Sequence, residues 1–156
     1  MSALSTDYLV ASLPSIAFDS AAPMTWDAFA ERCGGEEIVD GLLTDGGWHD
    51  LETELRNAMA EARGGADHCR AATGCSLYWR NRVSECFQEK DVMKRETLID
   101  RVWWDAAGER PPAASPLGRG ALATYAVRLK LALKRSAISR EAGNAAFDRL
   151  TAETKR

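Results

Sequence analysis

The side chains best suited to metal or thiol chemistry lie in one short segment. His68 and Cys69 are adjacent, and Cys75 and Cys86 follow within the same 19 residues. A structural zinc site usually presents its ligands as close pairs, two to four residues apart. Here the intervals are one, six and eleven residues. We therefore expect no metal site, and the spacing alone leaves open whether these four side chains ever bind a metal.

Nucleophilic catalysis requires a base beside a thiol or hydroxyl, and the chain has only two histidines, His49 and His68. His49 follows Trp48 at the expected start of a helix, where we predict a surface position. The nearby carboxylates are predicted to lie in solvent along the same helix: Glu52, Glu54 and Glu61. These residues do not predict a catalytic acid and base, and we expect no enzyme activity.

Three glycine pairs punctuate the sequence, beginning at Gly34, Gly46 and Gly64. None is followed by Lys-Ser/Thr, and none has the G-x-G-x-x-G order of a dinucleotide-binding loop. Glycine after an amphipathic segment is typical of a helix end. We therefore interpret the pairs as helix terminators and expect no nucleotide cofactor.

The overall composition predicts a single globular unit. The chain has 156 residues, 46% of them hydrophobic, which is enough for one core. No apolar run approaches the roughly 18–20 residues needed to span a bilayer. The first seven residues contain no Lys or Arg, and the first apolar run stops at Pro14, unlike a secretory signal. We expect the four cysteines to be thiols and the location to be cytoplasmic, peripheral to a membrane only through a complex.

Apolar residues recur at steps of three and four, which predicts helices, and sustained alternation typical of strands is lacking. We expect an all-α fold, a helical bundle of about six helices in a single domain. Residues 8–18 are predicted to be extended or briefly helical, with an interruption near Pro14. The main helices are expected over residues 26–33, 36–43, 48–62, 119–135, and from a cap at Ser139 onward. Residues 77–102 and beyond are expected to form two helices or one long bent helix, with a break near 89–91.

Charge divides the chain at the proline-rich residues 108–116. Residues 119–156 hold nine basic and three acidic residues, a net charge of +6, and the remainder holds 11 basic and 20 acidic residues, a net charge of −9. We expect an acidic helical body over residues 1–110 and a basic C-terminal helical pair over residues 117–156 packed on it. Such a division indicates an oriented partner surface or mutual attraction of the two parts, and it is equally compatible with two solvated helix faces that differ in charge.

The helix predicted over residues 119–135 is apolar on two sides, so it is either central in the core or in contact with a partner. Trp104 is predicted to point away from the buried face of its own helix, where it could anchor an interface. These patterns select five candidate partner-binding residues: Trp104, Val127, Arg128, Leu131 and Arg135.

Three segments of the chain, in order, resemble one family. They are Tyr8 to Ile16 with Pro23-Met24-Thr25 and Phe29, then Leu55 to Arg63, then Ser115 to Gly118 continuing into Thr124 to Leu131. They resemble an uncharacterised bacterial family that accompanies V-type ATPase genes. More distantly, they are similar to the funnel-shaped C protein, also called d, of V/A-type ATPases. That protein is longer and built of repeated helical domains, whereas this chain shows no internal repeat.

The resemblance implies a non-catalytic structural, coupling or assembly component, similar to part of the funnel that links the central stalk and the rotor ring. It implies ATPase stalk or rotor subunits as partners, with no small-molecule substrate and no cofactor. The alternative is a small nucleic-acid-binding regulatory protein that uses the basic C-terminal helix. The acidic isoelectric point of about 5.5 disfavours this alternative. A thiol- or metal-dependent enzyme is a third hypothesis.

Overall fold

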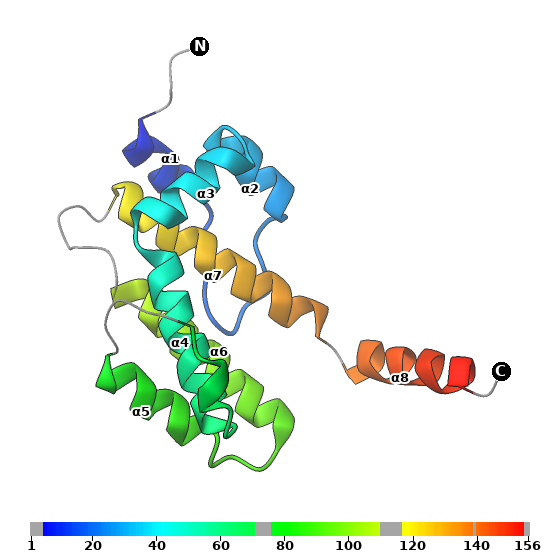
Figure 1. The fold of residues 1–156 in the computed structure, drawn as a ribbon. Helices are drawn as coiled ribbons and strands as arrows, with labels where there is room; N and C mark the ends of the chain where they lie inside the picture. The colour runs from blue at the N-terminus through cyan, green and yellow to red at the C-terminus, as the bar shows by residue number, and fades with distance from the viewer. Residues whose placement is uncertain (1–4, 71–75, 110–116, 139, 155–156) are drawn as a thin grey trace.

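The computed structural model describes residues 5–70, 76–109, 117–138 and 140–154, the last without the side chains of residues 140–142. The described part is all-α, as predicted, and contains no strand. None of its helices is both long and apolar enough to cross a membrane. The helices are α1 (Thr6–Ser12), α2 (Trp26–Cys33), α3 (Glu36–Asp45), α4 (Trp48–Ala62), the 3-10 helix η1 (Ala66–His68), α5 (Leu77–Cys86), α6 (Val92–Glu109), α7 (Arg119–Ala137) and α8 (Arg140–Thr154) (Figure 1).

The predicted count of about six helices is too low, because Thr6–Ser12 forms a helix of its own and the stretch from Leu77 divides into α5 and α6 near the expected break. Helix α2 begins at the predicted cap, where the Thr25 hydroxyl accepts a hydrogen bond from the backbone N–H of Ala28 at 3.3 Å. It ends at Gly34, whose φ of +102° lies in the left-handed region that favours glycine. Helix α4 has the predicted bounds.

Helix α7 lies at the centre of the fold and contacts α1, α2, α3 and α6 (Figure 1). Leu122, Ala126 and Leu129 are buried along one side of it, and Val127 and Leu131 are buried on the other. The two-sided apolar pattern therefore reflects a central position in the chain's own core. Val127 and Leu131, predicted to contact a partner, are both covered within the same chain.

Parts of the resembling segments that are far apart in sequence meet around Tyr125 on α7. The Tyr125 ring stacks on Phe29 of α2, with ring centroids 5.5 Å apart. The Tyr125 hydroxyl donates a hydrogen bond to the carbonyl oxygen of Pro14 at 2.9 Å. Leu9 on α1 is buried in the same core cluster. The N-terminal segment is thus a packed edge of the helical body.

Helix α8 extends away from the other helices beyond the end of α7 (Figure 1). Its two large apolar side chains, Phe147 and Leu150, are 66% and 64% exposed. The expected pair of C-terminal helices therefore separates into α7 inside the body and α8 outside it. The bundle comprises α1 to α7, and none of the described side chains of α8 belongs to its core.

Candidate functional site

Trp104 is buried, with only 6% of its surface exposed. Phe18, from the connector between α1 and α2, packs edge-on against the Trp104 ring, with centroids 5.5 Å apart and an interplanar angle of 78°. Trp104, predicted to contact a partner, is covered by Phe18 and by Arg128 of α7 in the same chain. Periodicity did not reveal which segments pack on this side of α6.

Arg128 on α7 lies over Trp104, with its guanidinium carbon 4.9 Å from the ring centroid. Its Nε and Nη2 donate to the Trp104 carbonyl oxygen at 3.4 and 3.3 Å. A β-carbon on Gly108 would overlap Nη2 of Arg128, so the guanidinium fits here because residue 108 has no side chain. Burial lowers the pKa of Arg128, although nearby Asp105 acts in the opposite direction. An arginine pKa is high enough that the side chain stays cationic at neutral pH despite this lowering, so Arg128 holds its charge in a partly desolvated position.

Two further arginines lie over Phe18. The guanidinium carbon of Arg135 is 3.9 Å from the ring centroid, and that of Arg101 is 5.0 Å from it. Such cation–π contacts fix the position of a guanidinium without neutralising its charge. The carboxylate paired with Arg135 belongs to Asp19, 85% exposed and 3.8 Å from Nη2, which is beyond hydrogen-bond distance. Arg135 is therefore held by an aromatic ring more than by a counter-ion.

Arg82 on α5 joins this group through Asp105. The Asp105 carboxylate is 3.0 Å from Nη2 of Arg82 and 3.2 Å from Nε of Arg101. Burial by itself would lower the pKa of Arg82, but its contacts with Asp105 and Tyr78 outweigh burial and raise the pKa. One aspartate thus orients two arginines from different helices.

We call this group the arginine seam, and it runs over α5, α6 and α7. Three of its arginines lie over Phe18 or Trp104, and a fourth joins them through a shared aspartate. The charged members are Arg82, Arg101, Arg128, Arg135, Asp19 and Asp105. The excess is two positive charges. Each guanidinium has five N–H donors in a planar fork that matches a carboxylate or phosphate. The chemistry available here is the binding of an anionic group.

The structure brings together three of the five predicted residues, Trp104, Arg128 and Arg135, and separates Val127 and Leu131 from them. Sequence reasoning missed Arg82, Arg101 and Phe18. The spacing of Arg101 and Asp105, four residues apart on one helix, is a signal that could have found one arginine of the seam. The positions of Phe18 and Arg82 depend on contacts between distant segments, and no local pattern encodes them.

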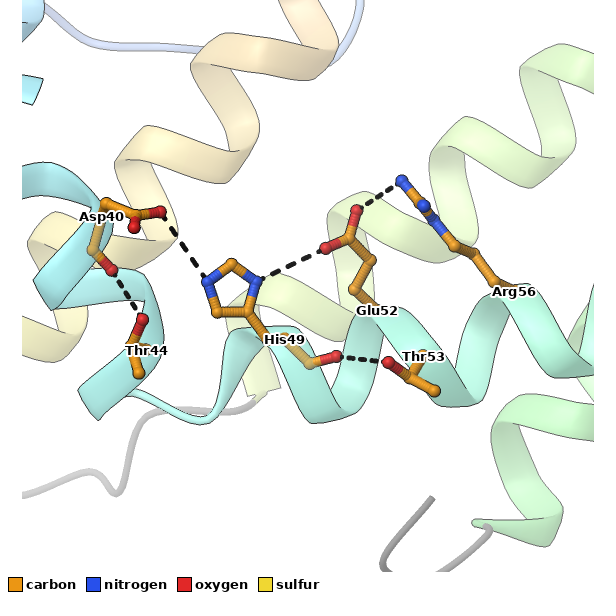
Figure 2. A network of polar contacts seen from close by, with 6 residues as sticks. All are labelled: Asp40, Thr44, His49, Glu52, Thr53 and Arg56. Carbon is orange, nitrogen blue, oxygen red and sulfur yellow. Dashed lines mark hydrogen bonds and ion pairs between the residues drawn. The ribbon is translucent and has the colours of Figure 1, made fainter. Parts of the chain in front are cut away.

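A second polar region surrounds His49 at the corner between α3 and α4 (Figure 2). Its Nε2 is 3.8 Å from Oδ1 of Asp40, and its Nδ1 is 3.6 Å from Oε2 of Glu52. Glu52 is also paired with Arg56 at 2.7 Å. The Thr53 hydroxyl donates to the carbonyl oxygen of His49 rather than to its ring. The imidazole lies at the surface, as predicted, and orients no nucleophile in this network.

An open groove of about 400 Å³ joins this network to the second histidine, His68. Asn57 and Arg70 both line this groove. The Asn57 side chain fixes the backbone of Arg70, because it accepts a hydrogen bond from the Arg70 N–H at 2.9 Å and donates one to the Arg70 carbonyl oxygen at 2.7 Å. Among the described residues, no three His, Cys, Asp or Glu side chains are placed to hold a metal ion. Cys75, one of the four potential ligands in the sequence, lies outside them.

Comparisons of the chain with protein-family models, curated proteins and solved structures found no match. We therefore infer function from the three resembling segments and from the charge and packing of the arginine seam.

Proposed function

We propose that this chain is a non-catalytic structural, coupling or assembly component of a V-type (V/A-type) ATPase. It would resemble part of the funnel-shaped C (d) protein that links the central stalk and the rotor ring. The observation that carries the proposal is the joint packing of Pro14, Phe29 and Tyr125. These residues come from the first and last of the resembling segments, and Tyr125 contacts both of the others.

Packing in a core constrains side chains jointly, because a close-packed interior tolerates little change in volume or shape. Resemblance at positions that contact one another therefore supports a shared fold more strongly than resemblance at scattered surface positions. The step from shared fold to shared role is an analogy. It identifies stalk or rotor subunits as the proposed partners, and a cytoplasmic position that is peripheral to the membrane through the complex.

Two surface features suit a component that acts through protein contacts. The arginine seam offers positioned donors on the helical body, and α8 extends from that body with Phe147 and Leu150 exposed. Exposed apolar side chains on an extended helix are characteristic of contact surfaces. A part that transmits force between subunits needs such contacts and no reacting groups of its own.

Co-purification tests the proposal. The tagged chain is expressed with the V-type ATPase genes of the same source, and the complex is isolated and analysed by mass spectrometry. We expect stalk or rotor subunits in a fixed ratio to the tagged chain. Recovery of an assembled ATPase that lacks the tagged chain, under conditions where both are expressed, contradicts the proposal.

The second candidate is nucleic-acid binding through the basic C-terminal helix, and the four arginines of the seam favour it. However, both lysines near the middle and end of α7 are engaged within the chain. Lys134 pairs with Asp100 at 2.6 Å, and Lys130 lies over Trp26 with its Nζ 4.6 Å from the ring centroid. Nucleic-acid binding predicts retention of RNA or duplex DNA at low salt and a steep loss with added salt. Absence of retention at about 50 mM salt excludes it.

A further inference from the structure

We infer that the arginine seam binds an acidic α-helical segment of a partner protein, with carboxylates of that segment on Arg101 and Arg135. The inference rests on the proposed function only in that the segment would belong to an ATPase subunit. Its physical basis is the uncompensated charge of the seam. Among the residues that the structure describes, the carboxylates paired with the four arginines are those of Asp19 and Asp105, and Asp105 is shared by two arginines.

Arg101 and Arg135 retain donors for an incoming anion. Arg101 uses its Nε for Asp105, and Arg135 has only the long contact to the exposed carboxylate of Asp19. No described residue accepts a hydrogen bond from the terminal nitrogens of either guanidinium. A carboxylate with two oxygens can accept two parallel N–H bonds from such a fork. The site is therefore complementary to carboxylates rather than to cations or neutral groups.

The guanidiniums are already in place before a partner arrives. Arg101 and Arg135 are positioned on Phe18, and Arg128 is positioned on Trp104 and against Gly108. Ordering a free arginine side chain on binding costs rotamer entropy, and positioned side chains avoid much of that cost. A preorganised, partly desolvated cation also attracts an anion more strongly than a fully hydrated one.

The positions of Arg101 and Arg135 suit an acidic helix. Their guanidinium carbons lie 5.0 and 3.9 Å from the centroid of the same Phe18 ring, so the two cations are near neighbours. Carboxylates three or four residues apart on a helix are neighbours on one face. A partner helix can therefore present one carboxylate to each arginine.

An acidic protein segment fits the seam better than a nucleic acid does. Proteins that bind single strands stack bases on accessible aromatic rings. Here the Phe18 ring carries two guanidiniums, and Trp104 is buried beneath a third. Neither ring therefore offers a face on which a base can stack.

Fluorescence anisotropy with synthetic probes tests the inference. The probe is a labelled, alanine-based helical peptide of about 18 residues with glutamates along one face at steps of three and four. The control peptide has glutamine at those positions. We expect the glutamate peptide alone to bind, and its affinity to fall about tenfold in the doubly substituted Arg101→Gln/Arg135→Gln chain.

The matched control is Arg119→Gln, which removes an exposed arginine of α7 outside the seam, and it should change the affinity less than about twofold. Gly108→Ala provides a second, charge-neutral variant, because its methyl group displaces the Arg128 guanidinium. We expect it to weaken binding about threefold. Circular dichroism confirms that each variant is folded before its affinity is compared.

The inference is overturned if the glutamine peptide binds equally well, if both seam variants retain wild-type affinity, or if polyuridylate binds more tightly than the glutamate peptide. Failure here is distinguishable from failure of the proposed function. Peptide binding without co-purification of ATPase subunits contradicts the proposed function alone. Co-purification that persists in Arg101→Gln/Arg135→Gln contradicts the role of the seam alone.

Discussion

Tyr125 on α7 donates a hydrogen bond to the carbonyl oxygen of Pro14, which precedes it by 111 residues, with an O···O distance of 2.9 Å. The same ring stacks on Phe29. This contact ties the N-terminal segment to the central helix of the fold. The connector that follows Pro14 then carries Phe18 to Trp104, so this attachment also positions part of the arginine seam.

Tyr125→Phe removes only the hydroxyl of this contact. We expect a loss of about 1 kcal/mol in the free energy of unfolding, because the Pro14 carbonyl loses its donor while the ring stack remains. Urea denaturation followed by circular dichroism measures the change. Tyr8→Phe is the control, since Tyr8 is 62% exposed, and it should change stability by less than about 0.5 kcal/mol. Equal effects of the two substitutions would contradict the structural role of Tyr125.

Local sequence signals identified most of the helices. Thr25 and the glycine pair at Gly34 bracket α2, and the spacing of apolar residues gave both ends of α4. These features depend on residues within a few turns of one another, so they are visible in a single sequence. The position of α8 could not be inferred in this way. Its periodicity is helical, but its Gly143 and Ala146 offer little surface to bury against the body.

The arginine seam was predictable only in part, because its contacts join residues that are distant in sequence. A two-sided apolar helix is compatible with a core position or a partner contact, and only the neighbours of α7 decide between them. Arg128 and Arg135 lie in the seam because α6 and Phe18 pack beside α7. Contacts such as Arg82 with Asp105, 23 residues apart, need the assembled fold.

The pair formed by Lys134 and Asp100 provides a test of core electrostatics. Asp100 is 4% exposed, whereas the Lys134 side chain is 44% exposed, and their charged atoms are 2.6 Å apart. Lys134→Met leaves a buried carboxylate without its partner, and we expect a loss of about 2–3 kcal/mol in the free energy of unfolding. Asp100→Asn should cost less, about 1 kcal/mol, because the exposed lysine can turn into solvent.

The exposed pair between Arg119 and Asp45 is the control for that comparison, with side chains 61% and 71% exposed. Arg119→Met should change stability by less than about 0.5 kcal/mol. All three variants are measured by urea unfolding at pH 7. A larger loss for Asp100→Asn than for Lys134→Met would contradict the assigned burial of the pair.

Thiol reactivity reports the packing of Cys86. Burial is the main cause that raises the pKa of the Cys86 thiol, and Sγ–H donates to the Arg82 carbonyl oxygen at 3.2 Å. We expect alkylation by iodoacetamide to be at least about tenfold slower than for free cysteine at pH 8. Peptide mapping by mass spectrometry measures the rate at Cys86, and urea should abolish the difference. Fast modification of the folded protein would show that Cys86 is accessible.

The free energy of unfolding should depend on pH because burial raises the pKa of three groups. Burial raises the pKa of Cys33, Cys86 and Tyr125, so the folded state holds these protons more tightly than the unfolded state. The unfolded chain loses its thiol protons above about pH 8.5, and the free energy of unfolding should decline as the pH rises further. Urea midpoints from pH 7 to 10 check this. A midpoint that rises over this range contradicts the prediction.

Removal of residues 139–156 tests the separation of α8 from the body. Because Phe147 and Leu150 are largely exposed, we expect the urea-derived free energy of unfolding of the remaining chain to change by less than about 0.5 kcal/mol. Leu129→Ala is the comparison, since Leu129 is fully buried in α7, and it should cost about 2–5 kcal/mol. A loss above about 2 kcal/mol on truncation would mean that α8 packs on the body.

Site-specific photo-crosslinking from position 19 tests the central claim most directly. Asp19 lies beside Arg135 and is 85% exposed, so a photoreactive amino acid there leaves every arginine of the seam in place. Position 45, on an exposed part of α3, is the control. We predict that illumination of the assembled ATPase links position 19, but not position 45, to an acidic helix of a stalk or rotor subunit. The absence of any ATPase subunit from the position-19 product would contradict the account.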